Sequence, residues 1–328
     1  MSKRVLIGMS GGIDSTVAAI LLQEQGYELV GATFRTFDLV KDANLSNTKG
    51  CCSEDSVTEA QKMAQLLGIE HHVLDFRETF HQYVISNFVN EYAHGRTPNP
   101  CVMCNSHIKW GKLMQAAEQY GCDYIATGHY AQIAEHRGHM YLKTAVDTHK
   151  DQTYFLACLD QQQLAHILFP LGEMTKPEIR ALAAEQGFET AHKSDSQDIC
   201  FVPDGDYAKF LEEHTGKTYP TGEFVNRSGE VIGKHNGAIR YTIGQRRGLN
   251  LALGKPVFVT EIRPETNEVV IGTNEDTFHD TLIANQVKRN KFYNRTPIEV
   301  IPEIFKNTNL SNAANELYLR MEDYVTNR

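Results

Sequence analysis

The sequence predicts an α/β protein in which a doubly wound parallel sheet is followed by a small β-rich central domain and a short β-rich C-terminal domain. Three observations support this prediction. β-rich apolar runs alternate with helical patterns in the first part of the chain, glycine and turn-forming pairs become dense after it, and two strand-like runs close the sequence. We therefore expect domains at residues 1–205, 206–275 and 276–328.

The first elements follow from the N-terminal residues. Residues 4–10 contain a short, β-rich apolar run that ends at Gly8, which predicts a buried strand. Residues 14–27 are rich in alanine and leucine and close near Gly26, which predicts a helix. Residues 28–37 predict a second strand, and strands joined through a helix are expected to be parallel, with a right-handed crossover.

The same alternation continues towards residue 205. A helix is expected over residues 53–69, begun by Ser53 or Asp55 and ended by Gly68. The later expected elements are a strand at 70–76, a helix at 106–121, a strand within 122–133 and a helix at 176–188. This alternation predicts the doubly wound arrangement of the first domain.

The composition narrows the class of protein. With 41% hydrophobic and 22% charged residues, the chain is typical of soluble globular proteins. No apolar run approaches the ~20 residues of a membrane span, and the N-terminal run is too short for a signal peptide. Seven cysteines, an odd number, argue against a fully paired secreted scaffold. We expect a cytoplasmic protein with no membrane partner, whose cysteines serve catalysis or metal binding.

The net charge of −9 provides no global attraction to nucleic acid, so a polyanionic partner requires a local basic surface. Such a surface is present in the segment that follows residue 230, where contact with phosphates and a solvated loop are both open interpretations. Its cations are Lys234, Arg240, Arg246, Arg247 and Lys255.

A glycine-rich turn, "GMSGGIDS", joins the first strand to the first helix. Backbone N–H groups at a helix N-terminus favour an anion, and Gly11 and Gly12 permit close approach of a ligand to the backbone. Ser10 and Ser15 supply hydroxyls, and Asp14 is placed to reach a metal or a ribose. The turn matches neither GxxxxGK[ST] nor GxGxxG. It resembles the pyrophosphate loop of ATP pyrophosphatases, which have no need of a lysine aimed at a γ-phosphate; an ordinary βα turn is the alternative.

A C-x-x-C motif, Cys101 and Cys104, is expected just before the helix at 106–121, where a helix N-terminus stabilises a thiolate. Half of a zinc site, a redox pair and a nucleophile are all open interpretations. Zinc requires a second pair of ligands. The candidates for that pair are Cys51, Cys52, His71 and His94, and the two cysteines are poorly spaced for it.

Three other cysteines lack such a motif. Taken alone, Cys200 lies between Ile199 and Phe201, as buried apolar cysteines commonly do. We interpret Cys122 and Cys158 in the same way.

Seven motifs in order across residues 4–273 resemble those of the tRNA-specific 2-thiouridylases, a family within the ATP pyrophosphatase superfamily. They are "GMSGGIDS", "GRTPNPCVMCN", "DYIATGHYA", "DTHKDQTYFL", "LFPLGEMTKPEIR", "KSDSQDICF" and "YTIGQRRGL". The resemblance implies ATP-dependent thiolation at C2 of the wobble uridine of tRNA, through adenylation of the uracil O2 and transfer of sulfur from a cysteine persulfide.

The resemblance also implies roles for individual residues. Cys200 would receive the persulfide from a separate sulfur-carrier protein, and Cys104, the nucleophile, would end disulfide-bonded to Cys200. ATP, with Mg²⁺ and no structural metal, would bind through Gly8, Met9, Ser10, Gly11, Gly12, Ile13, Asp14 and Ser15, with Phe34 and Gly128 along the adenosine. The target base would contact Asn99, Pro100 and Cys101, and the tRNA would contact His129, Lys150, Asp151 and Gln152.

Two departures from the family pattern stand out. Cys101 occupies a position where many members have an aspartate that assists proton transfer. The C-terminal region is short for the family's barrel, and Arg320 matches a tRNA-contacting residue there only loosely. An adenylating ligase for another acceptor, and a tRNA-binding paralogue without activity, are the alternative functions.

Overall fold

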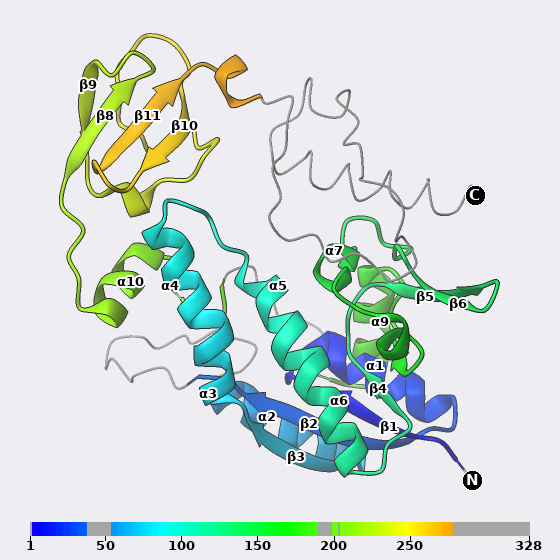
Figure 1. The fold of residues 1–328 in the computed structure, drawn as a ribbon. Coiled ribbons are helices and arrows are strands. Elements are labelled where there is room, and N and C mark those ends of the chain that lie inside the picture. Colours follow the sequence, from blue (N-terminus) through cyan, green and yellow to red (C-terminus); the bar gives the residue numbers. More distant parts are fainter. Residues whose placement is uncertain (1, 38–53, 189–198, 203, 279–328) are drawn as a thin grey trace. The chain divides into compact units, whose positions relative to one another are not determined.

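The computed structural model describes residues 2–37, 54–188, 199–202 and 204–278 (Figure 1). The chain divides into two compact units. The first contains the residues up to Asn87 together with Asn99–Gly205, and the second contains Phe88–Pro98 together with the residues from Asp206 onward. The chain therefore passes between the units three times. The region from residue 279, including Arg320 and the expected C-terminal strands, lies outside the described residues.

The first unit contains a parallel five-stranded sheet, which confirms the predicted fold class. The central strand is β1(Arg4–Gly8), whose three middle residues have no exposed surface. The strand order is β3(Glu70–Asp75), β2(Glu28–Arg35), β1, β4(Tyr124–Ala126) and β7(Ile167–Leu168). In chain order, β2 and β3 are thus added on one side of β1, and β4 and β7 are added on its other side.

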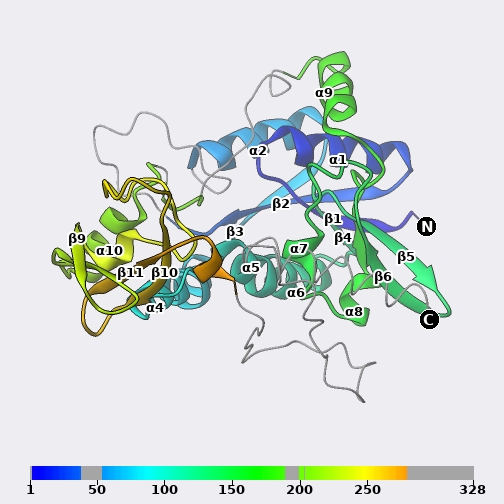
Figure 2. The same ribbon diagram turned by 90° about the horizontal axis from the view of Figure 1, so that it is seen from above.

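Helices cover both faces of this sheet (Figure 2). The helices α1(Ile13–Glu24), α2(Glu54–Leu66) and α9(Lys176–Glu185) lie on one face, and α6(Trp110–Gln119) lies on the other. Helix α1 is buried along most of its length because it packs on the sheet and on α9 at once. An apolar cluster of buried residues, which includes Val5, Ile7, Val17 and Ile179, joins the sheet to α1, α2 and α9.

One helical run was not predicted. It consists of α3(Arg77–Phe80), the π-helical turn η1(His81–Ile85) and α4(Ser86–Ala93). Its apolar residues Phe80, Val84 and Phe88 recur every four residues and are buried, so the helical pattern was present in the sequence. Polar residues between them, and the absence of a strong helix-starting residue, obscured its beginning.

The helix that contains the C-x-x-C motif begins earlier than predicted. It starts with α5(Pro100–Cys104), continues through the π-helical turn η2(Asn105–Lys109) and ends with α6. Proline at the first helical position and an asparagine cap fix the start at Pro100. The expectation that both cysteines precede the helix is therefore wrong: Cys101 lies in its first turn and Cys104 lies one turn further along.

The remainder of the first unit consists of small elements. A hairpin of β5(Gln132–His136) and β6(His139–Lys143) is followed by α7(Thr153–Leu156) and α8(Gln161–Leu164).

The second unit is β-rich, as expected from its dense turn signals. Its four-stranded sheet has the order β10(Phe258–Arg263), β11(Glu268–Gly272), β8(Gly222–Asn226) and β9(Val231–His235). Phe224, Val259, Val269 and Ile271 form the centre of its core. The unit also contains two short 3₁₀ turns, η4(Ala238–Arg240) and η5(Glu275–Thr277).

One helix of the second unit, α10(Tyr207–Thr215), was not predicted. It packs against residues of α4 through two aromatic pairs, Phe88 with Phe210 and Tyr92 with Tyr207. These contacts explain why residues 88–98 belong to the second unit.

Candidate nucleotide and sulfur-transfer site

The glycine-rich turn lies at the carboxyl edge of the sheet, where the strand order reverses between β1 and β4. Open α/β sheets bind ligands at such a reversal. Gly128, which follows β4, packs against the start of α1. A methyl group at Gly128 would lie 2.8 Å from the backbone carbon of Asp14 and 2.9 Å from the nitrogen of Ser15. The structure therefore brings together the turn and Gly128, as the proposed nucleotide site requires.

Two glycines shape the turn. Gly11 has φ +70°, and a methyl group there would lie 2.7 Å from Cβ of Glu59 on α2. Gly12 occupies the N-cap of α1 and makes no side-chain cap hydrogen bond, and no other described side chain accepts one from the first turn of that helix. The first amides of α1 thus have no side-chain acceptor, and they fit a phosphate group.

The hydroxyl groups of the turn are close to one another. Ser15 Oγ accepts a hydrogen bond from the N–H of Ser10 at 3.2 Å and donates to the carbonyl of Gly12 at 3.1 Å. The hydroxyl of Ser10 lies 3.4 Å from that of Ser15. This arrangement holds the turn curved around the start of α1.

A chain of hydrogen bonds supports the turn from behind. Met9 donates its N–H to the carbonyl of Ala32 at 2.8 Å, and the hydroxyl of Thr33 donates to the carbonyl of Met9 at 2.8 Å. Because that hydroxyl has used its hydrogen, His71 Nε2 donates to Thr33 Oγ1 at 2.8 Å. Burial, and then the neighbouring His72, lower the pKa of His71 and keep it neutral. His71 is therefore engaged in supporting the turn.

Lys176, which the sequence analysis missed, lies against the turn. It is the first residue of α9 and is 7% exposed. Its Nζ lies 2.7 Å from Oδ1 and 2.9 Å from Oδ2 of Asp14, and the hydroxyl of Tyr130 donates to the same Oδ1 at 2.7 Å. The turn contains no lysine of its own, but the fold supplies one. The capping box of Thr175 and Glu178 marks Lys176 as a helix start, but no local pattern connects it to Asp14.

Residues 150–152, expected to contact tRNA, are connected to this ion pair. The side-chain oxygen of Gln152 accepts the N–H of Tyr130 at 3.0 Å. The carboxylate of Asp151 accepts the N–H groups of Ala145 and Thr153. Both side chains hold the backbone of the loop, while Lys150 is half-buried. The contact of these three residues with tRNA stays a prediction.

His129 is buried between Trp110 and Phe169, with 7% of its surface exposed. Lys109 Nζ donates to His129 Nε2 at 3.4 Å, so the neutral ring carries its hydrogen on Nδ1 and donates to Thr127 Oγ1 at 2.7 Å. Burial, and then Lys109, lower the pKa of His129 well below its usual range. The predicted contact of His129 with tRNA is not tested by this placement.

The residues expected at the target base lie at the start of α5. Asn99 is exposed, and its side-chain oxygen caps the helix by accepting the N–H of Val102 at 3.2 Å. Pro100 is buried, Cys101 is exposed and Cys104 is half-buried. Asn105, buried beside Cys104, donates from Nδ2 to the carbonyl of Cys101 at 2.9 Å. The motif thus presents Cys101 to solvent on a capped helix end.

Cys200 differs from its neighbour in its surroundings. Phe201 is 3% exposed and packs edge-on against Phe80 and Phe37, whereas Cys200 itself is half-buried. The aromatic contacts anchor this segment while leaving the thiol partly accessible. Cys122 instead lies at the amino end of β4, away from the turn, and burial raises the pKa of its thiol. Cys158 is half-buried.

Phe34, expected along the adenosine, is 8% exposed in β2, with its ring 5.5 Å from that of Phe76. Within the described ranges, no three His, Cys, Asp or Glu side chains gather as metal ligands would. Cys51 and Cys52 lie outside those ranges. None of the described helices combines the length and the apolar character needed to cross a membrane.

Comparisons with known proteins identify the family. Residues 3–204 match the model of the tRNA methyl transferase HUP domain, and residues 208–273 match that of the tRNA methyl transferase PRC-barrel domain. A tRNA-specific 2-thiouridylase MnmA of Lachnoclostridium phytofermentans is 49% identical over 87% of this chain and 80% of its own length. Proteins of the same name from Cytophaga hutchinsonii and Clostridioides difficile are each 48% identical, over 91% and 88% of this chain and 83% and 80% of their own lengths. The chain belongs to the family of tRNA-specific 2-thiouridylases.

Proposed function

We propose that this chain is an ATP-dependent sulfurtransferase that replaces the C2 oxygen of the wobble uridine of tRNA with sulfur. The observation that carries the proposal is a glycine-rich turn, paired through Asp14 with the buried Lys176, in the same unit as two partly accessible cysteines, Cys104 and Cys200. Membership of the 2-thiouridylase family supports the choice of tRNA as substrate.

The turn is suited to holding the phosphates of ATP together with Mg²⁺. The amides at the start of α1 and the hydroxyl of Ser10 would donate to phosphate oxygens, and the ammonium group of Lys176 would oppose their charge. Asp14 would orient Lys176, and an Asp14 oxygen would be a ligand for Mg²⁺. ATP, when bound, supplies the adenylyl group that makes the uracil O2 a good leaving group.

The two cysteines would carry out the exchange of sulfur for oxygen. In this proposal Cys200 holds a persulfide received from a sulfur-carrier protein, and its terminal sulfur attacks C2 of the activated uracil, so that AMP leaves with the oxygen. The thiolate of Cys104 then attacks Sγ of Cys200. The bond between Cys200 Sγ and the sulfur on the base breaks, so that 2-thiouridine is released and a Cys104–Cys200 disulfide remains. A thiol reductant returns this disulfide to two thiols.

The test is mass spectrometry of tRNA nucleosides after incubation with ATP, Mg²⁺ and a persulfide donor. Cys104→Ser and Cys200→Ser are compared with Cys122→Ser, which removes a thiol at the opposite edge of the sheet. We expect 2-thiouridine with the unaltered protein and with Cys122→Ser, and none with the other two variants. Release of pyrophosphate without thiolation would instead favour a ligase that acts on another acceptor.

The proposal also specifies partners and location. The sulfur donor would be a separate protein that carries a persulfide, because the substrate and ATP supply no sulfur. The cytoplasm, where tRNA and a reducing thiol pool are both present, is the expected location.

A further inference from the structure

The cationic side chains of the second unit include some that form ion pairs and some that form none with described residues. Arg240 pairs with Asp206 and Glu212, Arg263 pairs with Glu261, and Arg227 pairs with Asp276. Arg240 was part of the basic surface expected from the sequence, and these ion pairs give it a structural role instead. The described residues provide no ion pair for Arg246, Arg247 or Lys255, all of which are exposed.

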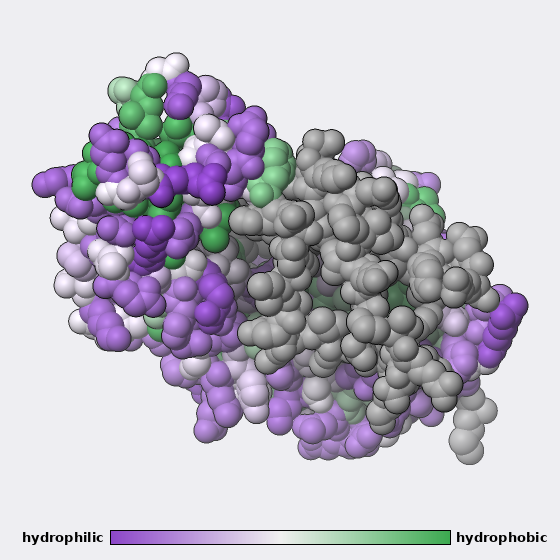
Figure 3. All heavy atoms as spheres, turned by 45° about the horizontal axis from the view of Figure 1, so that its top comes forward, coloured by the Kyte–Doolittle hydropathy of each residue, from purple (hydrophilic) through white to green (hydrophobic). Residues whose placement is uncertain are grey.

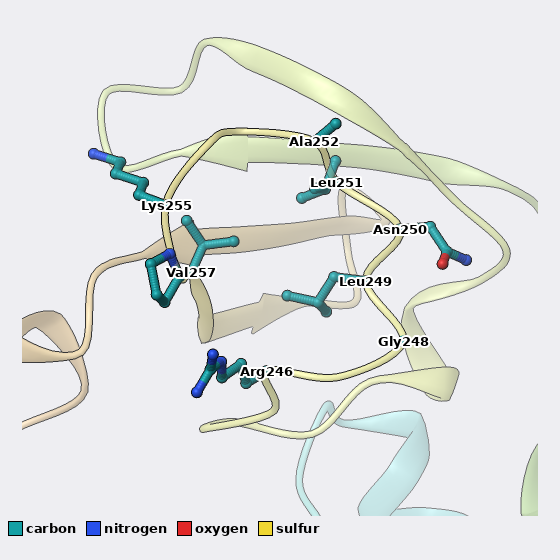
Figure 4. A pocket seen from close by; sticks show the side chains of 9 residues that line it. Arg246, Gly248, Leu249, Asn250, Leu251, Ala252, Lys255 and Val257 are labelled. Atoms are coloured by element: carbon teal, nitrogen blue, oxygen red, sulfur yellow. The ribbon is translucent and has the colours of Figure 1, made fainter.

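Arg246 and Lys255 line one cavity of about 320 Å³, formed by the loop between η4 and β10. Its floor is apolar because Leu249 and Val257 are nearly buried there and Leu251 lies beside them. Figure 4 shows Arg246 and Lys255 on the same side of the loop, with Val257 between them and Leu249 and Leu251 toward the other side. The cavity therefore combines an apolar surface with two positive charges that have no ion-pair partner among the described residues.

The backbone of this loop has a conformation that permits the close approach of a ligand. Gly248 has φ +76°, Asn250 has φ +53° and Gly254 has φ +69°, and these turns fold the loop back over the sheet. Apolar residues also interrupt the hydrophilic surface of this unit (Figure 3). Ile243 and Leu253 of the same loop region are 41% and 38% exposed. An anion with an attached planar or sugar group fits such a loop better than a bare ion does.

We propose that this cavity, defined by Arg246, Lys255 and the loop at residues 248–257, binds a phosphodiester of the tRNA backbone, with the attached ribose or base on Leu249 and Val257. The inference rests on the proposed function, since tRNA is the polyanion that this protein handles. The chain carries a net charge of −9, so tRNA attraction must come from local clusters of this kind. Phosphate contacts position an RNA without reading its sequence.

The test compares the double variant Arg246→Ala/Lys255→Ala with Lys217→Ala/Lys234→Ala. The control removes the same two charges from exposed positions of the same unit, outside the cavity. The dissociation constant for tRNA is measured across a series of salt concentrations. The cavity variant should bind roughly tenfold more weakly, and the slope of log K against log salt should fall by about 1 to 2, since each lost phosphate contact contributes about 0.7–0.9.

Thiolation at saturating tRNA separates this inference from the proposed function. We expect the cavity variant to raise the KM for tRNA and leave kcat within about twofold of the unaltered protein, because the phosphate contact acts before the chemistry. Equal slopes and affinities for the two double variants, in a protein that thiolates tRNA, would overturn the cavity assignment alone.

Discussion

The ammonium group of Lys176 lies 2.7 Å from Oδ1 of Asp14, although 162 residues separate the two in the chain. Lys176 is almost fully buried, whereas a third of the Asp14 side chain is exposed. Lys176 is thus held in the interior of the protein, while Asp14 lies at the surface of the glycine-rich turn. In the proposed nucleotide site, a cation in this position would face the phosphates as a lysine within the turn does elsewhere, and the fold brings it there from a distant part of the chain.

Replacement of Lys176 should impair the nucleotide step. In Lys176→Met, Asp14 keeps only Tyr130, and the phosphates lose a fixed positive charge. We expect the rate of pyrophosphate release to fall by roughly 10²–10³, with a partial return in Lys176→Arg. Lys217→Met, which removes an exposed lysine of the second unit, is the control and should retain the full rate.

Gly11 should tolerate no side chain. Gly11→Ala would combine a left-handed backbone with a methyl group 2.7 Å from Glu59 Cβ, so the turn must move. Gly68→Ala is a matched control because Gly68 has φ +67° and no atom within 4 Å of the added methyl group. The control should lose only about 1–2 kcal/mol of stability and keep pyrophosphate release, whereas Gly11→Ala should lose that activity. Thermal unfolding and the release assay measure both.

The hydrogen-bond chain behind the turn makes Thr33 a positioning residue. Thr33→Val keeps the shape but removes the hydroxyl that links His71 to the Met9 carbonyl. We expect the KM for ATP to rise several-fold while kcat changes less, and Thr33→Ser should restore the KM. An unchanged KM in Thr33→Val, measured by ATP titration of pyrophosphate release, would show that the turn holds its shape without this chain.

Stability should depend on pH through His129. Its folded pKa lies well below the unfolded value of about 6.5, so in acid the unfolded chain binds a proton that the folded protein does not. Stability is therefore full above pH ~6.5 and falls as the pH decreases below it, by at most about 1.4 kcal/mol per pH unit for one histidine. His71 and His235, whose pKa values are also lowered, act in the same direction.

Urea unfolding at several pH values between about 5 and 7 tests this dependence. His129→Gln should reduce the slope of the free energy of unfolding against pH, whatever its effect on the absolute value. His136→Gln, which alters an exposed histidine, should leave the slope unchanged. Equal slopes in both variants would assign the acid sensitivity to other groups.

Cys101 is exposed on the first turn of α5, at the position where the family resemblance implies an aspartate. If it assists proton transfer, Cys101→Asp should keep or increase the rate of thiolation, and Cys101→Ala should lower it by roughly 10²-fold. Full activity in both Cys101→Ser and Cys101→Asp would make this position a bystander. Nucleoside mass spectrometry in single-turnover conditions measures the rates.

The parallel core could be predicted because its signals are local. The run before Gly8 is apolar, a glycine follows the end of both α1 and α2, and strands and helices alternate along the chain. The helix over Arg77–Ala93 was not predicted because polar residues interrupt its apolar pattern. The cysteine helix starts earlier than predicted because Pro100 occupies its first position, ahead of the apolar pattern that predicted it.

The site could be predicted only where a motif is contiguous. The turn at Gly8–Ser15 is one such motif, and its meeting with Gly128 follows from the strand order. The positions of Lys176 and His71 depend instead on which elements pack side by side, and no spacing in the sequence encodes that. The same holds for Arg240, whose charge is indistinguishable in sequence from that of Arg246 but is neutralised by α10.

The three passages of the chain between the units have a consequence for how the protein can be divided. The second unit is joined to the first at residues 87–88, 98–99 and 205–206, so no single cut in the chain separates the two units. A truncation at residue 205 would leave residues 88–98 in the shortened chain. It would also deprive Phe88 and Tyr92 of the aromatic rings of α10 that they contact.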